Sequence, residues 1–310
     1  MYDLIILGAG PAGLSASIYA SRYKINHIII GSIFDSSTSK AHLLENWPGE
    51  KSIKGIDLVN NFYNHAKSFG TDIFQENVIE IKKEVNSDSK KNIFIVKTNL
   101  DKSYQAKSVL TALGTKHRKL NIPGEEEFLG KGVSYCAVCD GPFFKDKIVA
   151  VVGGSNSAVM AATMLSEHTN KVYLIYRGES LRCEPIVLDR VEKNTKIEII
   201  YNTNIINVLG ENKVQSVELD NEHEGDKKLK IEGLFIEAGS TPSVSLVREL
   251  GVVVDNKSCI LIDQSGSTNV KGVYAAGDIT NGSNGLRQIV TAASEGAIAA
   301  TSIYGYLKEE

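Results

Sequence analysis

Residues 3–14 read DLIILGAGPAGL, a short apolar run that leads directly into a glycine-rich turn. The run at residues 3–7 has the length of a buried strand, and Gly8, Gly10 and Gly13 follow it with the spacing G-x-G-x-x-G. Such glycines permit a tight turn, the close approach of a pyrophosphate and close packing of the following helix. The stretch therefore predicts an α/β fold with a dinucleotide-binding turn.

The residues after the turn complete the unit. Residues 14–23 form a helical stretch and residues 27–30 a second apolar run. Strand, turn, helix and strand make a βαβ unit, whose helix amides face a phosphate. The acidic residue that commonly binds a ribose after the second strand is absent, because Gly31 and Ser32 stand there. Ribose recognition must then use other groups.

The same layout recurs about 145 residues later. Residues 147–152 are apolar, residues 153–158 form a turn of small residues, residues 159–168 are helical and residues 171–176 form a further strand. The turn is made by Gly153, Gly154, Ser155, Asn156, Ser157 and Ala158. Two copies of the unit predict two dinucleotide sites.

Charged residues follow the last strand of the second unit. Arg177 and Arg182 suit a 2′-phosphate, because a guanidinium pairs with phosphate through two hydrogen bonds. Glu179 could instead accept a hydrogen bond from a free 2′-hydroxyl, and all three could simply be solvated loop charges. These alternatives remain open at the level of the sequence.

The repeat predicts a domain inserted within a domain. Residues 1–114 and 242–310 would form a first domain, and residues 115–241 a second. Both are expected to be three-layer, Rossmann-like α/β domains. Two chain crossings would join them, which makes a relative rotation physically plausible.

Further elements follow from local patterns. Residues 56–68 and 288–307 are predicted helices. Residues 78–110 predict a small antiparallel sheet with a charged turn at 86–91, and residues 197–237 repeat this with a charged turn at 221–230.

Length and composition agree with a two-domain enzyme. The chain has 310 residues, of which 42% are hydrophobic and 23% charged, with a net charge of −3. This balance offers no basic surface for nucleic acid and no polybasic arm for a membrane. We expect no membrane span and no signal peptide, and hence a cytoplasmic protein.

Cys136 and Cys139 lie three residues apart, followed directly by Asp140. Cysteines at this spacing can close a redox disulfide, and Asp140 could carry a proton during thiol exchange. Half of a zinc site is a competing interpretation, but structural zinc normally needs a second pair of ligands. An incidental buried pair is another. No metal is expected, and Cys183 and Cys259 are left without a role.

Taken together, these motifs resemble the low-molecular-weight thioredoxin reductases over essentially the full chain. The motifs that fall in the order of that family are Gly8-x-Gly10-x-x-Gly13, Glu45-Asn46-Trp47-Pro48-Gly49, Cys136-x-x-Cys139-Asp140 and Gly277-Asp278…Arg287-Gln288. The resemblance implies FAD on the first domain and a nicotinamide cofactor on the second, with NADPH expected and NADH possible. It also implies a homodimer and thioredoxin, or a thioredoxin-like protein, as the substrate.

The resemblance also assigns residues to roles. Cys139 would lie nearest the flavin, Cys136 would attack thioredoxin, and Asp140 would donate a proton. The positions expected to bind FAD are Gly8, Gly10, Pro11, Ala12, Gly13, Asn46, Val78, Ala112, Gly277, Asp278, Arg287 and Gln288. Those expected to bind NAD(P)H are Gly153, Gly154, Ser155, Asn156, Ser157, Arg177 and Arg182.

The chain departs from the family at four places. Asp35-Ser36-Ser37 replaces a Gly-Gly-Gln stretch, and about two extra residues separate Asp278 from Arg287. Gly-Gly-Ser-Asn-Ser-Ala replaces Gly-Gly-Gly-Asp-Ser-Ala in the second turn, and one arginine is missing from residues 176–182. These departures favour keeping other donors in view, namely NADH or ferredoxin. They also leave open a dithiol oxidase that uses oxygen, and a flavin-binding redox sensor.

Overall fold

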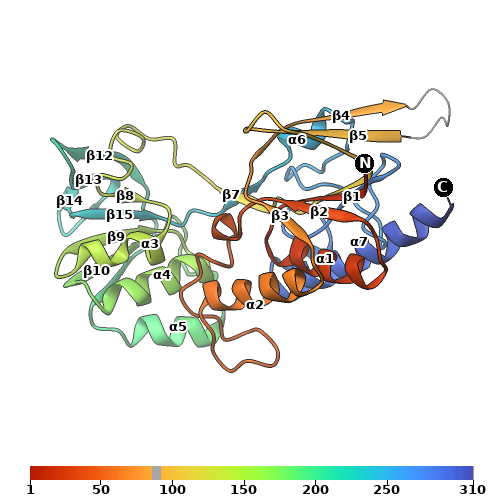
Figure 1. The fold of residues 1–310 in the computed structure, drawn as a ribbon. Coiled ribbons are helices and arrows are strands. Elements are labelled where there is room, and N and C mark those ends of the chain that lie inside the picture. Colours follow the sequence, from red (N-terminus) through yellow and green to blue (C-terminus); the bar gives the residue numbers. More distant parts are fainter. Residues whose placement is uncertain (86–91, 310) are drawn as a thin grey trace. The chain divides into compact units, whose positions relative to one another are not determined.

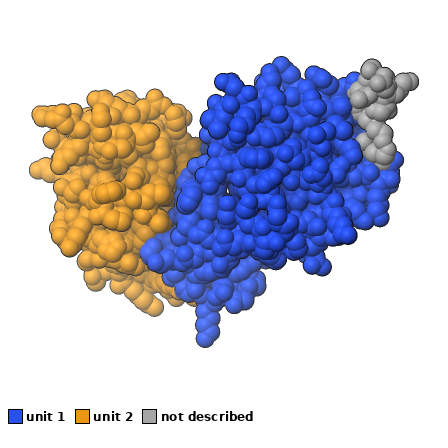
Figure 2. Space-filling view, viewed as in Figure 1, with its two compact units in different colours: residues 1–116, 241–310 blue, residues 117–240 orange. Residues whose placement is uncertain are grey.

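The computed structural model describes residues 1–85 and 92–309 and divides into two compact units (Figure 2). Unit 1 comprises residues 1–116 and 241–310, and unit 2 comprises residues 117–240. The sequence placed the two crossings at 114/115 and 241/242. Strands β7 (Thr115–His117) and β16 (Ser240–Pro242), which lie at the crossings, pair as a two-stranded sheet. The charged turn expected at 86–91 lies outside the described residues.

Unit 1 is built on one large sheet (Figure 1). Its strands lie in the order β3, β2, β1, β6, β5, β4, with β17 paired to β6. The parallel part contains β1 (Tyr2–Leu7), β2 (His27–Ile30), β3 (Asp72–Phe74) and β17 (Val273–Ala275), and the antiparallel part contains β4 (Val78–Val85) and β5 (Asn92–Thr98). Strand β6 (Ser103–Thr111) pairs with β5 in its first half, up to Ala106, and with β1 from Ala106 to its end.

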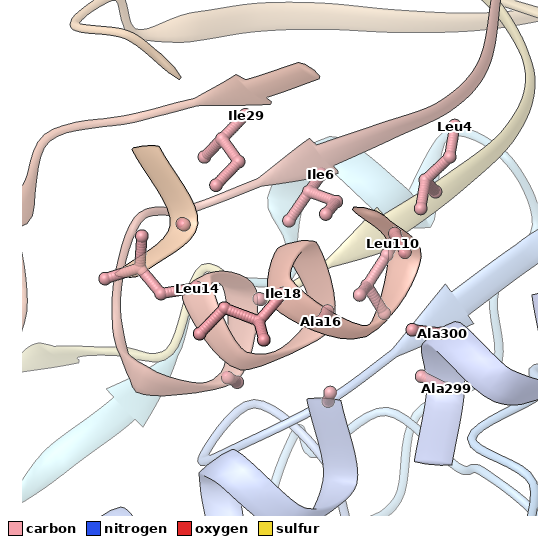
Figure 3. Close-up of a cluster of buried hydrophobic side chains, with 14 of the residues drawn as sticks. Leu4, Ile6, Leu14, Ala16, Ile18, Ile29, Leu110, Ala299 and Ala300 are labelled. Carbon is pink, nitrogen blue, oxygen red and sulfur yellow. The ribbon is translucent and has the colours of Figure 1, made fainter. Parts of the chain in front are cut away.

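Both faces of the parallel part are buried, and this explains its continuous apolar strands. Leu4 and Ile6 of β1 join a cluster with Leu14 of helix α1 (Pro11–Arg22), Leu110 of β6 and Ala299 of helix α7 (Ile289–Glu309) (Figure 3). The alternate residues of β1 pack on the opposite face. That second cluster includes residues of β6, β17 and helix α6 (Ser245–Arg248). Helix α2 (Gly55–Ser68) packs on the first cluster.

Unit 2 repeats the parallel plan on a smaller scale (Figure 1). Its main sheet has the order β11, β10, β9, β15, β8, and a separate antiparallel sheet has the order β12, β13, β14. The main strands are β8 (Val133–Ser134), β9 (Ile148–Val152), β10 (Lys171–Ile175), β11 (Ile197–Ile200) and β15 (Gly233–Ile236). The others are β12 (Ile205–Gly210), β13 (Val214–His223) and β14 (Asp226–Lys230). The helices are α3 (Ala137–Asp140), α4 (Asn156–Ser166) and α5 (Pro185–Glu192).

Short 3₁₀ turns complete the described elements. They are η1 (Ile33–Asp35), η2 (Gly141–Phe144) and η3 (Ser283–Gly285). No helix within residues 1–85 and 92–309 is long and apolar enough to cross a membrane.

Two expectations for the antiparallel regions were wrong in detail. The strands at 78–110 pair antiparallel as predicted, but they extend the large sheet of unit 1, because β6 also pairs with β1. The predicted charged turn at 221–230 is mostly strand. Only Glu224 and Gly225, both with positive φ, form the turn between β13 and β14. The charges of β14 are exposed, so polarity there marks a solvated strand rather than a loop.

Candidate functional site

Cys136 and Cys139 form a disulfide in unit 2, with their Cα atoms 5.3 Å apart. Strand β8 ends at Ser134, and the one-turn helix α3 places Cys139 back over Cys136. The amide of Cys139 donates to the Cys136 Sγ at 3.2 Å. Cys139 is exposed and Cys136 partly buried. An exposed disulfide of this kind is accessible for thiol exchange.

Ser134 ties Asp140 to the disulfide, a contact that sequence reasoning missed. The Ser134 Oγ accepts from the Cys136 amide at 3.0 Å and donates to the Asp140 Oδ2 at 2.6 Å. Ser134 itself is buried at the end of β8, where it pairs with Phe235 of β15. Asp140 is thus held in a fixed direction beside the two sulfur atoms.

Tyr135 anchors the strand that carries the disulfide. Its hydroxyl donates to Glu125, which also accepts from the amides of Leu120 at 2.9 Å and Asn121 at 2.6 Å. Burial raises the pKa of Tyr135, and the hydrogen bond to Glu125 raises it further. Tyr135 therefore remains a neutral donor at physiological pH.

In the first glycine turn, in unit 1, two glycines are closely packed and the third borders an open space. A Cβ on Gly8 would lie 2.4 Å from the Ala112 carbonyl oxygen, and one on Gly13 would lie 1.9 Å from the Gly8 carbonyl oxygen. A Cβ on Gly10 would meet nothing closer than the Ser36 Cβ, at 3.6 Å. Gly8 and Gly13 are thus needed by the fold, whereas Gly10 borders space that the protein does not fill. This arrangement suits a phosphate group.

Pro11 and Ala12 begin helix α1 at this turn, and no side chain within the described residues caps the helix. Its first amides are therefore open to an anion, as the N-terminus of a helix permits. Gly31 lies against the same turn, because a Cβ there would come within 3.0 Å of the Ala9 nitrogen. This close approach explains why no acidic side chain occupies the end of β2.

The structure brings Gly277 and Asp278 beside this turn. A Cβ on Gly277 would lie 3.1 Å from the Ala12 Cβ. Burial raises the pKa of Asp278, while Arg287 lowers it and Glu295 raises it.

The remaining residues expected to bind FAD lie in unit 1 as well. The Asn46 Nδ2 donates to the Gln288 Oε1 at 3.0 Å, across 242 positions of sequence. The Arg287 Nη2 donates to the Sγ of buried Cys259 at 3.3 Å, which gives that cysteine a structural contact. Val78 begins β4 and packs against the second core cluster.

Glu295 of α7 organises the loop after Asp278, a role that no local pattern in the alanine-rich helix indicates. Its carboxylate accepts from the Gly277 amide at 2.8 Å, from the Thr280 Oγ1 at 2.9 Å and from the Ser283 Oγ at 2.6 Å. The loop contains Ser283 and Asn284 with positive φ, so it is a strained turn. Glu295 holds this lengthened loop in place.

The second glycine turn, in unit 2, is packed on aromatic and backbone groups. A Cβ on Gly153 would lie 2.3 Å from the Glu237 carbonyl oxygen, and one on Gly154 would lie 2.5 Å from the ring of Tyr176. Ser155 precedes α4 without a side-chain cap, and Ser157 is exposed. Asn156 exchanges two hydrogen bonds with Glu184, at 2.9 and 2.7 Å.

Tyr176 also explains the missing arginine. A Cβ on Gly178 would lie 2.6 Å from the Tyr176 ring, so a larger residue there would displace the ring. Arg182 lies beside the glycine turn, since its amide donates to the Gly154 carbonyl at 2.6 Å. Its guanidinium lies 5.7 Å from the centre of the Tyr176 ring, and both Arg177 and Arg182 are exposed. The two arginines remain available to an anionic ligand.

The disulfide leaves Cys136 and Cys139 without free thiolates for a metal. A different group, Glu198, His223 and Glu224, has ligand atoms within 4.8 Å of one another. One of its two carboxylates, that of Glu198, forms an ion pair with the Lys171 Nζ at 2.5 Å.

Comparison with known proteins extends over nearly the whole chain. Residues 2–296 match the family described as pyridine nucleotide-disulphide oxidoreductase. The thioredoxin reductase of Listeria innocua is 37% identical over 312 residues, which cover 100% of this chain and 95% of that protein. The crystal structure of Lactococcus lactis thioredoxin reductase has a TM-score of 0.92 at 33% identity, with 100% of both chains covered. That of T. acidophilum thioredoxin reductase has a TM-score of 0.89 at 36% identity, with 98% of each chain covered.

Proposed function

The chain belongs to the pyridine nucleotide-disulphide oxidoreductase family and is a flavoprotein disulfide reductase, and from that premise we propose that it reduces thioredoxin, or a small thioredoxin-like protein, with NADPH as donor. The Cys136–Cys139 disulfide carries this proposal. It lies in the unit whose sheet also bears the second glycine turn.

The chemistry follows from the two sulfur atoms. Two electrons break the Cys136–Cys139 bond, and the two sulfur atoms take up protons as they become thiols. The Cys136 thiolate then attacks the substrate disulfide and forms a mixed disulfide, which releases one substrate thiolate. Cys139 attacks the mixed disulfide, releases the second substrate thiolate and restores the original bond. Asp140, held by Ser134, supplies a proton to a departing thiolate.

We propose that FAD binds at the first glycine turn, where bound FAD supplies the two-electron relay between the nicotinamide and the disulfide. The open space at Gly10 and the uncapped start of α1 support this placement. Asn46, Asp278, Arg287 and Gln288 would complete the site.

We assign the nicotinamide nucleotide to the second turn, with Arg177 and Arg182 on its 2′-phosphate. The absence of a side chain at residue 178 removes one expected phosphate contact. NADH or ferredoxin is therefore the alternative donor, and a dithiol oxidase that uses oxygen is the alternative reaction.

Anaerobic titration distinguishes these functions. NADPH should bleach the flavin absorbance by about two equivalents, because the flavin and the Cys136–Cys139 disulfide each take up two electrons, and subsequent addition of oxidised thioredoxin should restore it. Bleaching only by NADH, or only by reduced ferredoxin, would overturn the choice of donor. Peroxide formation from a small dithiol without nicotinamide would instead favour the oxidase.

We also propose a homodimer in the cytoplasm. An open groove in unit 1 is lined by α1, α2 and α7 and includes Ile18, Trp47, Phe62 and Ile298. We assign it to a second copy of the chain, as the resemblance implies. Thiol exchange with thioredoxin requires a compartment that keeps thiols reduced, which supports the cytoplasm.

Sedimentation velocity tests the dimer. Ile298→Lys should give a monomer, because it places a charge in the groove, whereas Leu100→Lys, at an exposed apolar residue elsewhere in unit 1, should remain dimeric. Dimers of both variants would assign the groove to another role.

A further inference from the structure

Glu237 lies where the strand order of unit 2 reverses. The first strand of the repeat, β9, has β10 on one side and β15 on the other, and Glu237 directly follows β15. In parallel α/β sheets, ligands bind outside the carboxyl ends of the strands at this point of reversal. Glu237 therefore occupies a position at which a ligand is expected.

The strand register places Glu237 opposite the glycine turn. Ile236 pairs with Val152, and the Glu237 amide continues the ladder with a hydrogen bond of 2.8 Å to the Val152 carbonyl. The next pair across is thus Glu237 and Gly153. Their contact is close, because a Cβ on Gly153 would lie 2.3 Å from the Glu237 carbonyl oxygen.

The side chain of Glu237 is on the face where helix α4 begins. Side chains alternate along a strand, so Glu237 shares its face with Phe235. Phe235 belongs to the core cluster that also contains Ala158 and Val159 of α4. The Glu237 carboxyl group and the N-terminus of α4 consequently border the same edge of the sheet.

The carboxyl group of Glu237 is partly withdrawn from solvent. Within residues 1–85 and 92–309 its side chain makes no hydrogen bond and no ion pair, although it is only partly exposed. Burial raises the pKa of Glu237 to about 7. An acceptor that is withdrawn from water and left unpaired is matched by a ligand that donates hydrogen bonds.

We propose that Glu237 accepts a hydrogen bond from the nicotinamide half of the bound dinucleotide, either from its ribose hydroxyls or from its carboxamide. Arg177 and Arg182 follow β10, on the other side of β9, and take the adenosine half. A dinucleotide that crosses the glycine turn then extends its second half over the end of β15. This inference deepens the proposed function and rests on it.

Calorimetric binding to the oxidised holoenzyme tests the inference, with NADP⁺, 2′-phospho-ADP-ribose and 2′,5′-ADP as ligands. Glu237→Gln and Glu237→Ala should each lower the affinity for NADP⁺ by about tenfold or more, as expected for a lost hydrogen bond to a charged group. Neither should change the affinity for 2′,5′-ADP. A loss shared by 2′-phospho-ADP-ribose assigns the contact to the ribose, and a loss confined to NADP⁺ assigns it to the carboxamide.

Glu222→Gln, an exposed glutamate of β13, serves as the matched control and should bind all three ligands as the wild type does. NAD⁺, ADP-ribose and ADP form a parallel series for an enzyme that prefers NADH. Unchanged NADP⁺ affinity in the Glu237 variants, or an equal loss for 2′,5′-ADP, would overturn the inference alone. A wild type that binds no nicotinamide nucleotide would overturn the proposed donor, and the inference with it.

Discussion

Single polar side chains set the chemistry around the disulfide and the second turn. Ser134 has one hydroxyl that contacts both the Cys136 amide and the Asp140 carboxylate. Glu237, in contrast, has a carboxyl group with no described partner. The hydroxyl of Ser134 is fully paired and fixes the direction of Asp140, whereas burial disfavours the charged form of the Glu237 carboxyl group.

Ser134→Ala should slow the reduction of thioredoxin about tenfold, because a hydrogen bond that orients a charged group is lost. Flavin reduction by the donor should not change. Stopped-flow kinetics separates the two steps, and the pH profile of the thioredoxin step should shift in the variant. Ser134→Thr should restore much of the rate, and exposed Ser103→Ala should have no effect. An equal loss in both steps would instead indicate general misfolding.

Glu237 should make stability depend on pH in the absence of nucleotide. Burial raises the pKa of Glu237 from 4.5 to about 7, and no charged neighbour contributes. The folded state therefore holds a proton that the unfolded state releases, and this contribution is lost as pH rises from the unfolded pKa to the folded one. Glu237→Gln removes the penalty, so the variant should gain about 1 kcal/mol at pH 5.5 and about 3 kcal/mol at pH 8.

Urea unfolding of the wild type and Glu237→Gln at the two pH values measures this gain. As a control at an exposed position, Glu222→Gln should differ from the wild type in free energy of unfolding by the same amount at both pH values. A gain that does not grow with pH would contradict the assignment of the raised pKa to Glu237.

At the scale of elements, both glycine turns join a strand to a helix, but they differ in what surrounds them. In the first turn, the position of Gly10 is open, and Gly8 and Gly13 are closely packed. In the second, Tyr176 and the Glu237 backbone fill the space beneath both glycines. The first turn is further braced by α7, whose Gly296 allows an approach to Ala12 that any side chain would prevent.

The contrast within the first turn predicts opposite outcomes for two similar substitutions. Gly10→Ala should leave apoprotein stability within about 1 kcal/mol of the wild type, because φ is −84° and the Cβ has room. FAD affinity should nevertheless fall at least tenfold, since the methyl group occupies the phosphate space. Gly13→Ala should destabilise the fold itself by about 3 kcal/mol or more, because its Cβ would overlap the Gly8 carbonyl.

Urea unfolding of the apoprotein and fluorescence titration with FAD measure the two quantities. Gly305→Ala is the control, because a Cβ at this position of α7 would meet nothing within 4 Å. It should retain the stability of the apoprotein and its affinity for FAD. Unchanged FAD affinity in Gly10→Ala would place the phosphates elsewhere.

At the scale of the whole molecule, the chain crosses between two units only twice, and its two proposed cofactor sites lie in different units. Electron transfer then requires the disulfide and the flavin to meet at one stage and the dithiol and the substrate at another. The two cysteines must divide these tasks. Exposure alone favours Cys139 as the attacking thiol, whereas the family resemblance assigns attack to Cys136.

Trapping decides between the two cysteines. Cys139→Ser should accumulate a mixed disulfide between Cys136 and thioredoxin, because the residue that resolves it is gone, and Cys136→Ser should accumulate none. Non-reducing electrophoresis and mass spectrometry of the linked peptides identify the bond. The reverse pattern would exchange the two roles.

Much of the fold could be predicted from local sequence. The apolar runs and glycine spacing at residues 3–13 and 147–158 predicted two parallel units, and the insertion of one within the other followed from their order. The continuous strand β6 could not be predicted, since its two halves pair with different partners. Charged β14 was missed because an exposed strand needs no apolar alternation.

The candidate site could be predicted from the sequence only where its chemistry depends on residues that are close together in the chain. The Cys136–Cys139 disulfide and the two tight glycine turns could be predicted because their geometry depends on neighbours within a few residues. Tyr176, Glu237 and Glu295 were missed because their roles arise from contacts with distant segments. The sequence by itself therefore determined the two glycine turns and the disulfide, whose geometry is local. Only the tertiary structure decided which polar groups are paired and which remain without a partner, because burial and pairing depend on the packing of the whole sheet.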